Sequence, residues 1–203
     1  MGDFMLAEVV RANGSLLLVT ADSPILVGIF DGFSWIRFEG RGSFMNSPAI
    51  KAFGDSRIAA GESLIVIDLS GCSGMDSTFM GTLAGMAARL SAQDGGELQI
   101  AEPGERNRRS LEDLGLDFLM EIDPPTALWR GRVGEIRREL HEPQLPGVFG
   151  RAQRARHVLE AHQALAELNE ENSRDFVGVI SQLEKEMAEK SAKEKLAESD
   201  GNA

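Results

Sequence analysis

The sequence predicts an α/β fold, with helices packed on a single sheet and a long C-terminal helical extension. Up to residue 123, short apolar runs of strand type alternate with segments whose apolar residues recur at helical spacing. Residues 151–198 contain no proline and carry one apolar stripe of helical period. These two patterns indicate one mixed domain followed by a helical appendage.

Six segments have the composition and pattern of short β-strands. Trp35–Glu39 (WIRFE) alternates apolar and polar residues, which is typical of a strand buried on one face, and Gly40 is expected to end it. Leu64–Leu69 (LIVIDL) is a nearly continuous apolar run, which is typical of a strand covered on both faces. A loop over Ser70–Met75 is expected to follow. The other predicted strands are Leu16–Thr20, Ile25–Phe30, Glu97–Ala101 and Phe118–Ile122.

Helical patterns separate these strands. A helix is expected from Pro48 to about Ile58, with Ile50 and Phe53 turned inward. Residues 106–114 predict another helix, and Gly115 follows it where a helix commonly ends. The helix between these two, which begins after the predicted loop, combines an apolar stripe with small residues that allow a neighbour to pack closely. The stripe is Phe79, Leu83, Met86 and Leu90, and the small residues are Gly81, Ala84, Gly85 and Ala88.

Changes in composition divide the chain into four parts. Residues 1–32 are expected to hold the N-terminal strands of the domain, and residues 33–123 its core. Residues 124–150 combine a short helix around Val133, Ile136 and Leu140 with a linker rich in proline and glycine. Residues 151–203 are expected to form the C-terminal helical extension, which ends in a polar tail.

The C-terminal extension carries its stripe at intervals of three and four residues, a period of about 3.67 residues per turn. This period predicts a long helix, or a hairpin of two helices, that buries the stripe. The stripe can face the chain's own domain, a different protein, or a second copy of the chain in a coiled-coil homo-oligomer through residues 151–198. Its members are Leu165, Leu168, Asn172, Phe176, Val179, Leu183 and Met187.

Composition argues against several classes of function. A net charge of -11 disfavours nucleic-acid binding, because neutralising phosphates requires clustered Lys and Arg. The apolar runs are too short for a membrane span, and the N-terminus lacks the basic segment of a secretory signal. The single cysteine, Cys72, has no basic neighbour in sequence and is expected to be a buried or half-buried thiol. We therefore expect a cytoplasmic protein that binds neither nucleic acid nor membrane.

No pattern indicates catalysis, a cofactor or a metal ion. His157 and His162 are five residues apart, whereas two ligands on one helix face stand four apart, and His141 also lies outside the core of the domain. Asp68 and Asp76 lie on either side of a predicted loop. Acid–base catalysis by such a carboxylate pair also needs a pocket and further polar residues, which the sequence does not indicate. The sequence therefore predicts a protein that is not an enzyme.

The most specific pattern lies in residues 64–81, where an apolar strand and a loop precede a helix that opens with Asp76, Ser77 and Thr78. This arrangement resembles STAS domains, the family of the anti-sigma-factor antagonists. Three flanking segments are similar to the same family: 35–41 (WIRFEGR), 94–100 (DGGELQI) and 108–119 (RRSLEDLGLDFL). The resemblance covers about residues 33–123 and implies a STAS-like sheet with helices packed on it.

The resemblance also implies a phosphorylation site. In the family, a partner kinase that is also an anti-sigma factor phosphorylates the serine directly after the aspartate. That residue is Ser77 here, with Thr78 as the neighbouring alternative. Family members usually have glycine where this chain has Phe79. The phenylalanine makes the helix start bulkier, which changes the surface that the usual kinase would fit. The implied partner-binding residues are Asp76, Ser77, Thr78, Phe79 and Met80.

The chemistry of a helix start suits such a switch. Backbone N–H groups there lack partners within the helix, and the side chain of Asp76 or Ser77 can cap them while remaining exposed to a kinase. Phosphorylation adds about -1.5 to -2 charges, which the helix dipole favours by about 0.3–1 kcal/mol. The same charge disrupts docking to an acidic or apolar partner surface. Folding is spared while association is lost.

The function that the resemblance implies is an anti-sigma-factor antagonist, which regulates transcription through phosphorylation-controlled binding. Its implied partners are a GHKL-type kinase and a phosphatase. The alternative is a STAS-type scaffold or sensor subunit of a signalling assembly, which uses the C-terminal helix for oligomerisation or docking. The long C-terminal extension favours this alternative, because a minimal STAS module lacks it.

Overall fold

The computed structural model describes residues 11–12, 15–16, 25–144 and 150–200. Two short strands, β1 (Arg11–Ala12) and β2 (Ser15–Leu16), pair antiparallel. The predicted strand Leu16–Thr20 otherwise lies outside the described residues. The division of the chain at residues 32, 123 and 150 stays a prediction.

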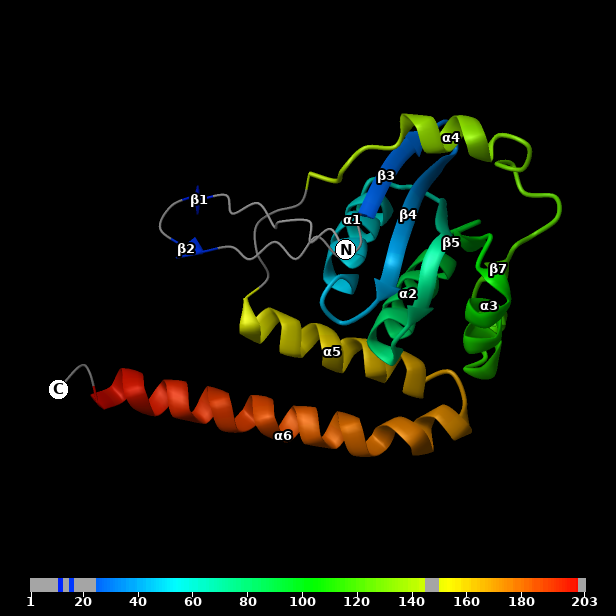
Figure 1. Ribbon diagram of the computed structural model, residues 1–203. Helices are drawn as coiled ribbons and strands as arrows, with labels where there is room; N and C mark the ends of the chain where they lie inside the picture. The colour runs from blue at the N-terminus through cyan, green and yellow to red at the C-terminus, as the bar shows by residue number, and fades with distance from the viewer. Residues whose placement is uncertain (1–10, 13–14, 17–24, 145–149, 201–203) are drawn as a thin grey trace, which may run out of the picture.

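A five-stranded sheet with the strand order β3-β4-β5-β6-β7 forms the centre of the molecule (Figure 1). The first pair is antiparallel and the others are parallel, as expected where helices connect successive strands. The strands are β3 (Ile25–Phe30), β4 (Phe33–Gly42), β5 (Leu64–Met75), β6 (Glu97–Ala101) and β7 (Glu121–Ile122). The mixed α/β prediction is confirmed.

Two central strands are longer than predicted. We expected one strand to end at Gly40 and a loop over Ser70–Met75, but β4 continues to Gly42 and β5 to Met75. The two extensions pair with each other in a ladder that contains two register shifts. Such irregularities accommodate the glycines that break the apolar pattern in both segments. The longer ladder brings the end of β4 next to the start of the following helix.

Helices cover one face of the sheet, as their apolar stripes predict. Buried side chains of the strands, including Ile36, Ile65 and Ile67, pack against Leu83 and Leu111 of these helices. Ile50 is buried and Phe53 packs at the edge of this core. The helices are α1 (Ser47–Ala59), α2 (Ser77–Ser91) and α3 (Gly104–Asp113).

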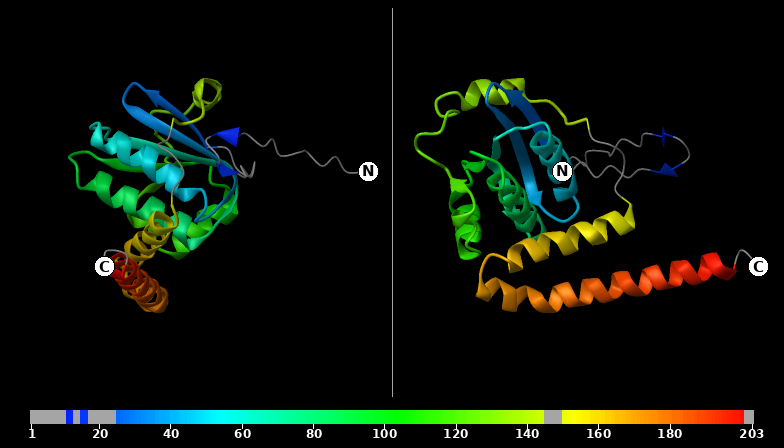
Figure 2. Two further views of the ribbon diagram at one scale, coloured as in Figure 1. Left: turned by 90° about the vertical axis from the view of Figure 1, so that its left-hand side faces the viewer. Right: turned by 180° about the vertical axis from the view of Figure 1, so that it is seen from behind.

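A second core lies on the opposite face of the sheet. Trp129 and Ile136 pack there on Phe33, Trp35 and Val66, and all five side chains are buried. Trp35 also meets Trp129 edge to face, with ring centroids 5.5 Å apart. The prediction that Trp35–Glu39 is buried on one face only is therefore wrong. The cover comes from the segment that ends in helix α4 (Val133–Glu139), which lies away from α1 and α2 (Figure 2).

The last predicted strand, Phe118–Ile122, is only partly correct. A single 3-10 turn, η1 (Leu116–Phe118), precedes the two-residue strand β7. Leu116 and Met120 point into the core, whereas Phe118 is 89% exposed, so the pattern of inward residues is helical until Met120. Gly115 has a φ of 72°, which a glycine adopts without strain at the end of α3.

The C-terminal extension is a hairpin of two antiparallel helices, α5 (Arg151–Ala166) and α6 (Glu170–Asp200). We call α5 and α6 together the C-terminal hairpin. Helix α5 packs on α2, and α6 runs along the outer side of α5 (Figures 1 and 2). The predicted stripe is buried or half-buried except at Val179, which is 43% exposed, whereas its neighbour Ile180 is half-buried.

The described helices include none that is both long and apolar enough to cross a membrane.

Candidate functional site

Asp76 fixes the start of α2. Its Oδ1 accepts a hydrogen bond of 2.8 Å from the backbone N–H of Phe79, which is the capping bond expected of an aspartate at this position. Its Oδ2 accepts a second bond of 2.9 Å from the backbone N–H of Phe44, in the turn between β4 and α1. One carboxylate therefore holds the helix start and the neighbouring turn together.

Ser77 is the first residue of α2 and is half-buried. Its Oγ lies 3.0 Å from Nε2 of His162 on α5. Nδ1 of His162 lies 2.8 Å from the carbonyl oxygen of Val158, and only a protonated nitrogen can donate to a carbonyl. With Nδ1 donating to that carbonyl, Nε2 is the ring nitrogen that faces the hydroxyl of Ser77. The expected exposure of Ser77 to a kinase is not present in this structure, because α5 lies against it.

The other sequence-predicted site residues point away from the surface. Thr78, Phe79 and Met80 are all buried, so of the five implied partner-binding residues only Asp76 and Ser77 are partly accessible.

The bulk of Phe79 is directed into the core and not toward a partner. Its ring lies 4.8 Å from that of Phe38, measured between centroids. A Cβ at Gly42 would come within 2.7 Å of this ring, so the glycine in β4 provides the space that the larger side chain needs. Phe79 stands where the family usually has glycine, and its larger side chain is thus accommodated inside the domain.

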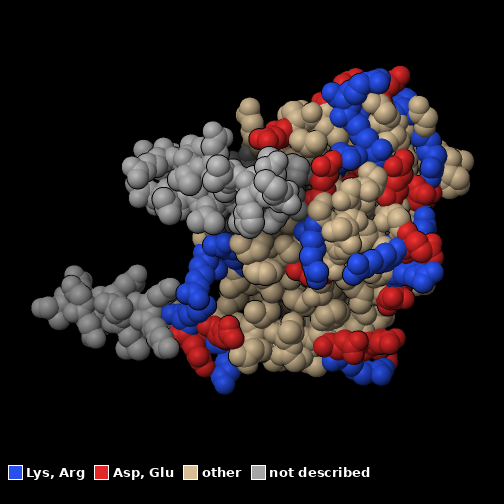
Figure 3. All heavy atoms as spheres, viewed as in Figure 1, with Lys and Arg blue, Asp and Glu red and all other residues tan. Residues whose placement is uncertain are grey.

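Two exposed apolar side chains that the sequence analysis did not single out lie beside Asp76. Phe44 is 46% exposed and Met45 is 57% exposed, in the turn that Asp76 holds. The sequence contains a signal for this exposure, because two large apolar residues follow the glycine-rich end of a strand. Such residues in a turn have little core to enter and are therefore expected to remain exposed. In the view of Figure 3, much of the surface between the sheet and α5 is uncharged, and Lys and Arg gather over α4 and at the N-terminal end of α5.

His157 connects α5 to two helices of the domain. Its Nε2 lies 2.8 Å from Oγ of Ser47 on α1 and 3.2 Å from Oγ1 of Thr82 on α2. The spacing of His157 and His162 in the sequence bears only on metal binding. Their role in packing could not be read from spacing, because their partners are 75 to 110 residues away in the chain.

The remaining candidates do not form a reactive site. Cys72 is buried, and burial raises the pKa of its thiol. Asp68 lies on the opposite face of the sheet from α2, where Arg137 binds it, so Asp68 and Asp76 belong to different places. Within the described residues, no group of three or more His, Cys, Asp or Glu side chains is arranged to hold a metal ion.

The fold and this helix start together define a small α/β module that presents a capped helix N-terminus beside an apolar turn. The family model of the STAS domain matches residues 24–127, a range slightly wider than the predicted 33–123. The chain belongs to the STAS domain family.

Several solved structures are similar to this chain. The anti-sigma factor antagonist SpoIIAA in its unphosphorylated form has 20% identity and a TM-score of 0.43, over 55% of this chain and 96% of that one. The phosphorylated form of this Bacillus cell fate determinant has 21% identity and a TM-score of 0.42, over 50% and 92%. An anti-sigma factor antagonist from Mycobacterium paratuberculosis has 24% identity and a TM-score of 0.44, over 53% and 91%. Curated proteins give no match. The family assignment rests on the STAS model.

Proposed function

We propose that this protein is an anti-sigma-factor antagonist that acts in the cytoplasm by docking to a partner and not by catalysis. The partner is a GHKL-type kinase, and phosphorylation of Ser77 controls the docking. Membership of the STAS family supports this proposal. The observation that carries it is the position of Ser77, on the first turn of α2, outside the core and next to a carboxylate that caps the helix.

The geometry favours Ser77 over Thr78 as the phosphorylated residue. Thr78 is buried, and its backbone carbonyl accepts the hydroxyl of Thr82 inside the helix packing. The hydroxyl of Ser77 instead points out of the domain, toward α5. A kinase therefore gains access to Ser77 when α5 moves, whereas Thr78 is buried in the helix packing.

The partner surface that we propose consists of Asp76, Ser77, Phe44 and Met45. The two apolar side chains offer area to bury, and Ser77 lies beside them. A phosphate there would face a desolvated interface, where an unpaired charge disrupts docking. A change of about 2.8 kcal/mol alters affinity a hundredfold, which is sufficient for a switch.

The proposal is tested by mass spectrometry of the protein isolated from its host, together with binding of the copurifying kinase to variants. Ser77→Ala is expected to keep the kinase bound, and Ser77→Asp to weaken binding about a hundredfold. Ser73→Asp is the matched control, since Ser73 is exposed and lies outside α2. If Ser77→Ala and Ser77→Asp both bind like the native protein, the switch does not exist.

The scaffold alternative is supported by the length of the last helix. Helix α6 has 31 residues and α5 has 16, so α6 continues well beyond its partner in the C-terminal hairpin. Val177 and Val179 on α6 are also exposed. A helix of this kind can join two copies of the chain. The oligomeric state of the protein therefore distinguishes the antagonist from the scaffold.

A further inference from the structure

Helix α5 occupies the face of α2 that begins at Ser77. Ala161, His162 and Leu165 of α5 are buried against the domain. A Cβ at Gly81 would collide with the backbone carbonyl of Ala161, so the two helices touch backbone to backbone at that residue. The small residues predicted to allow close packing on α2 thus receive a helix of the same chain.

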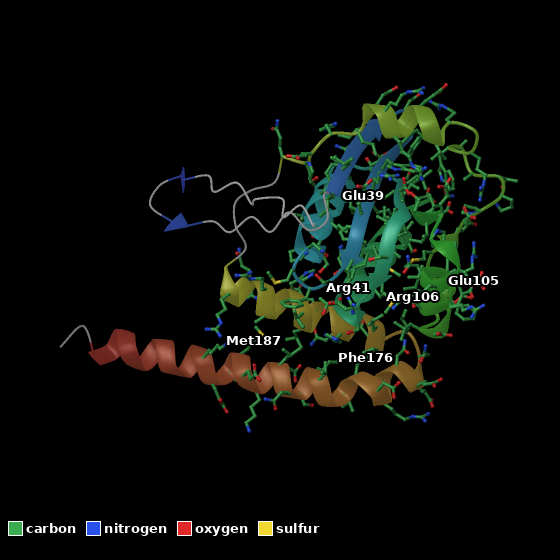
Figure 4. All side chains as sticks on the ribbon, viewed as in Figure 1. Glu39, Arg41, Glu105, Arg106, Phe176 and Met187 are labelled. Carbon is green, nitrogen blue, oxygen red and sulfur yellow. The ribbon has the colours of Figure 1, made fainter. Side chains whose placement is uncertain are left out.

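His162 closes this contact over the proposed phosphorylation site. Its ring lies between Ser77, 3.0 Å from the hydroxyl, and Phe176 of α6, with ring centroids 5.4 Å apart. Phe176 and Met187 both point from α6 toward α5 (Figure 4). The second helix of the hairpin therefore supports the first where it covers Ser77.

The surface beneath α5 is suited to being uncovered. The groups that meet His157 and His162 are the hydroxyls of Ser47, Ser77 and Thr82, and water can replace the histidines as their hydrogen-bond partners. Gly81 and Gly85 present backbone and no apolar side chain to this surface. Detaching α5 therefore uncovers hydroxyls and helix backbone, together with the apolar contact that Leu165 makes with the core.

We infer that the C-terminal hairpin is an intramolecular cover over Ser77, at one edge of the partner-binding surface, and that docking of α5 and phosphorylation of Ser77 exclude each other. That the displaced partner is a kinase rests on the proposed function. The coupling itself depends only on the contact between α5 and α2.

Exclusion follows from the size and charge of a phosphate. The Ser77 oxygen and His162 are separated by one hydrogen bond, in a contact that Phe176 backs. A phosphoryl group replaces the hydroxyl proton of that bond and adds three acceptor oxygens. The gap holds neither these oxygens nor their water, so α5 must move away. Before phosphorylation, the same contact keeps a kinase from Ser77.

The test is hydrogen–deuterium exchange of the α5 amides in the full-length protein. Ser77→Glu places a carboxylate in the contact, and Gly81→Gln places a side chain against the Ala161 backbone. Both are expected to increase the exchange rate of α5 about tenfold or more, while β5 amides stay protected. Ser73→Glu and Gly178→Gln are the matched controls, because Ser73 is exposed and a Cβ at Gly178 meets nothing within 4 Å.

A reversible lock separates detachment from damage. A Cβ at Gly85 would lie 3.8 Å from Cβ of Ala164, the usual separation in a disulfide. In Ser77→Glu with Gly85→Cys and Ala164→Cys, the oxidised protein is expected to keep α5 protected and the reduced protein to lose that protection.

Native protection of α5 in Ser77→Glu overturns the inference, as does equally fast exchange in Ser73→Glu. No kinase takes part in this measurement. A negative result in the exchange measurement therefore contradicts only the intramolecular cover. A kinase that binds Ser77→Asp as tightly as the native protein contradicts only the proposed function.

Discussion

His157 is a neutral, buried histidine between the hairpin and the domain. Burial is the main cause that lowers its pKa, and the positive charge of Lys51 adds to it. The carboxylates of Asp55 and Asp76 act in the opposite direction but do not compensate, and the pKa falls to about 4. A proton added to this ring would put an uncompensated charge between three helices. Acid should therefore weaken the docking of α5.

The first prediction concerns this pH dependence. Because the docked-state pKa of about 4 lies below the ordinary 6.5, the released chain binds the proton first as the pH falls. The contribution of His157 to docking is unchanged above pH 7 and decreases between about pH 6.5 and pH 4. The free energy of opening α5, measured by hydrogen exchange, is expected to drop by about 2 kcal/mol from pH 7 to pH 5.

The matched variant is His157→Gln, which can still hydrogen-bond to Ser47 but does not titrate. Its opening free energy is expected to lack this 2 kcal/mol decrease. A decrease of the same size in both proteins would assign the effect to other groups.

Among the elements, α4 is held to the sheet by an ion pair in addition to the packing of Ile136. Nε and Nη2 of Arg137 bind the two carboxylate oxygens of Asp68 at 2.8 and 3.0 Å, and Nη2 also binds Glu102 at 2.7 Å. Burial alone would raise the pKa of Asp68, but the hydrogen bonds from Arg137 and then Ser70 outweigh it, so the pKa lies below its ordinary value. The pair anchors the segment that carries Trp129 over the second core.

Removing this arginine is expected to destabilise the domain. In Arg137→Met, the carboxylate of Asp68 stays buried with weaker compensation from Arg37, and we expect a loss of about 3 kcal/mol in urea denaturation. Arg138→Met is the control, since Arg138 is the exposed neighbour on α4, and its cost should stay below about 0.5 kcal/mol. Equal effects of the two substitutions would show that the ion pair with Asp68 does not anchor α4.

At the scale of the whole molecule, the hairpin uses most of the apolar stripe that could have joined two chains. Leu165 is fully buried against the domain, and Leu168, Phe176, Leu183 and Met187 are half-buried between the two helices. Helix α5 is about 24 Å long and α6 about 46 Å, so α6 continues past the end of α5. The sequence of this last part of α6 is mainly polar. The intramolecular arrangement leaves little apolar area for a dimer.

We therefore expect the full-length protein to be a monomer at micromolar concentration. Size-exclusion chromatography with light scattering measures this directly, and the expected mass is the 22.0 kDa of one chain. A stable dimer that Val179→Lys dissociates would instead support the scaffold function and a second copy on α6. Gly178→Lys, at an exposed position of the same helix, controls for the added charge.

Local patterns in the sequence determined the α/β class, the cap at Asp76, the packing surface of α2 and the helical extension. Each of these depends on residues within one or two turns of helix or one strand, so spacing alone reveals it. The tertiary structure decided what covers each surface: Trp129 over Trp35, and His162 over Ser77, 85 residues away. Such contacts depend on how whole elements pack against each other. The periodicity of the sequence does not reveal which residue a buried polar side chain will contact. For this reason, the sequence located Ser77 but could not show that the chain covers it.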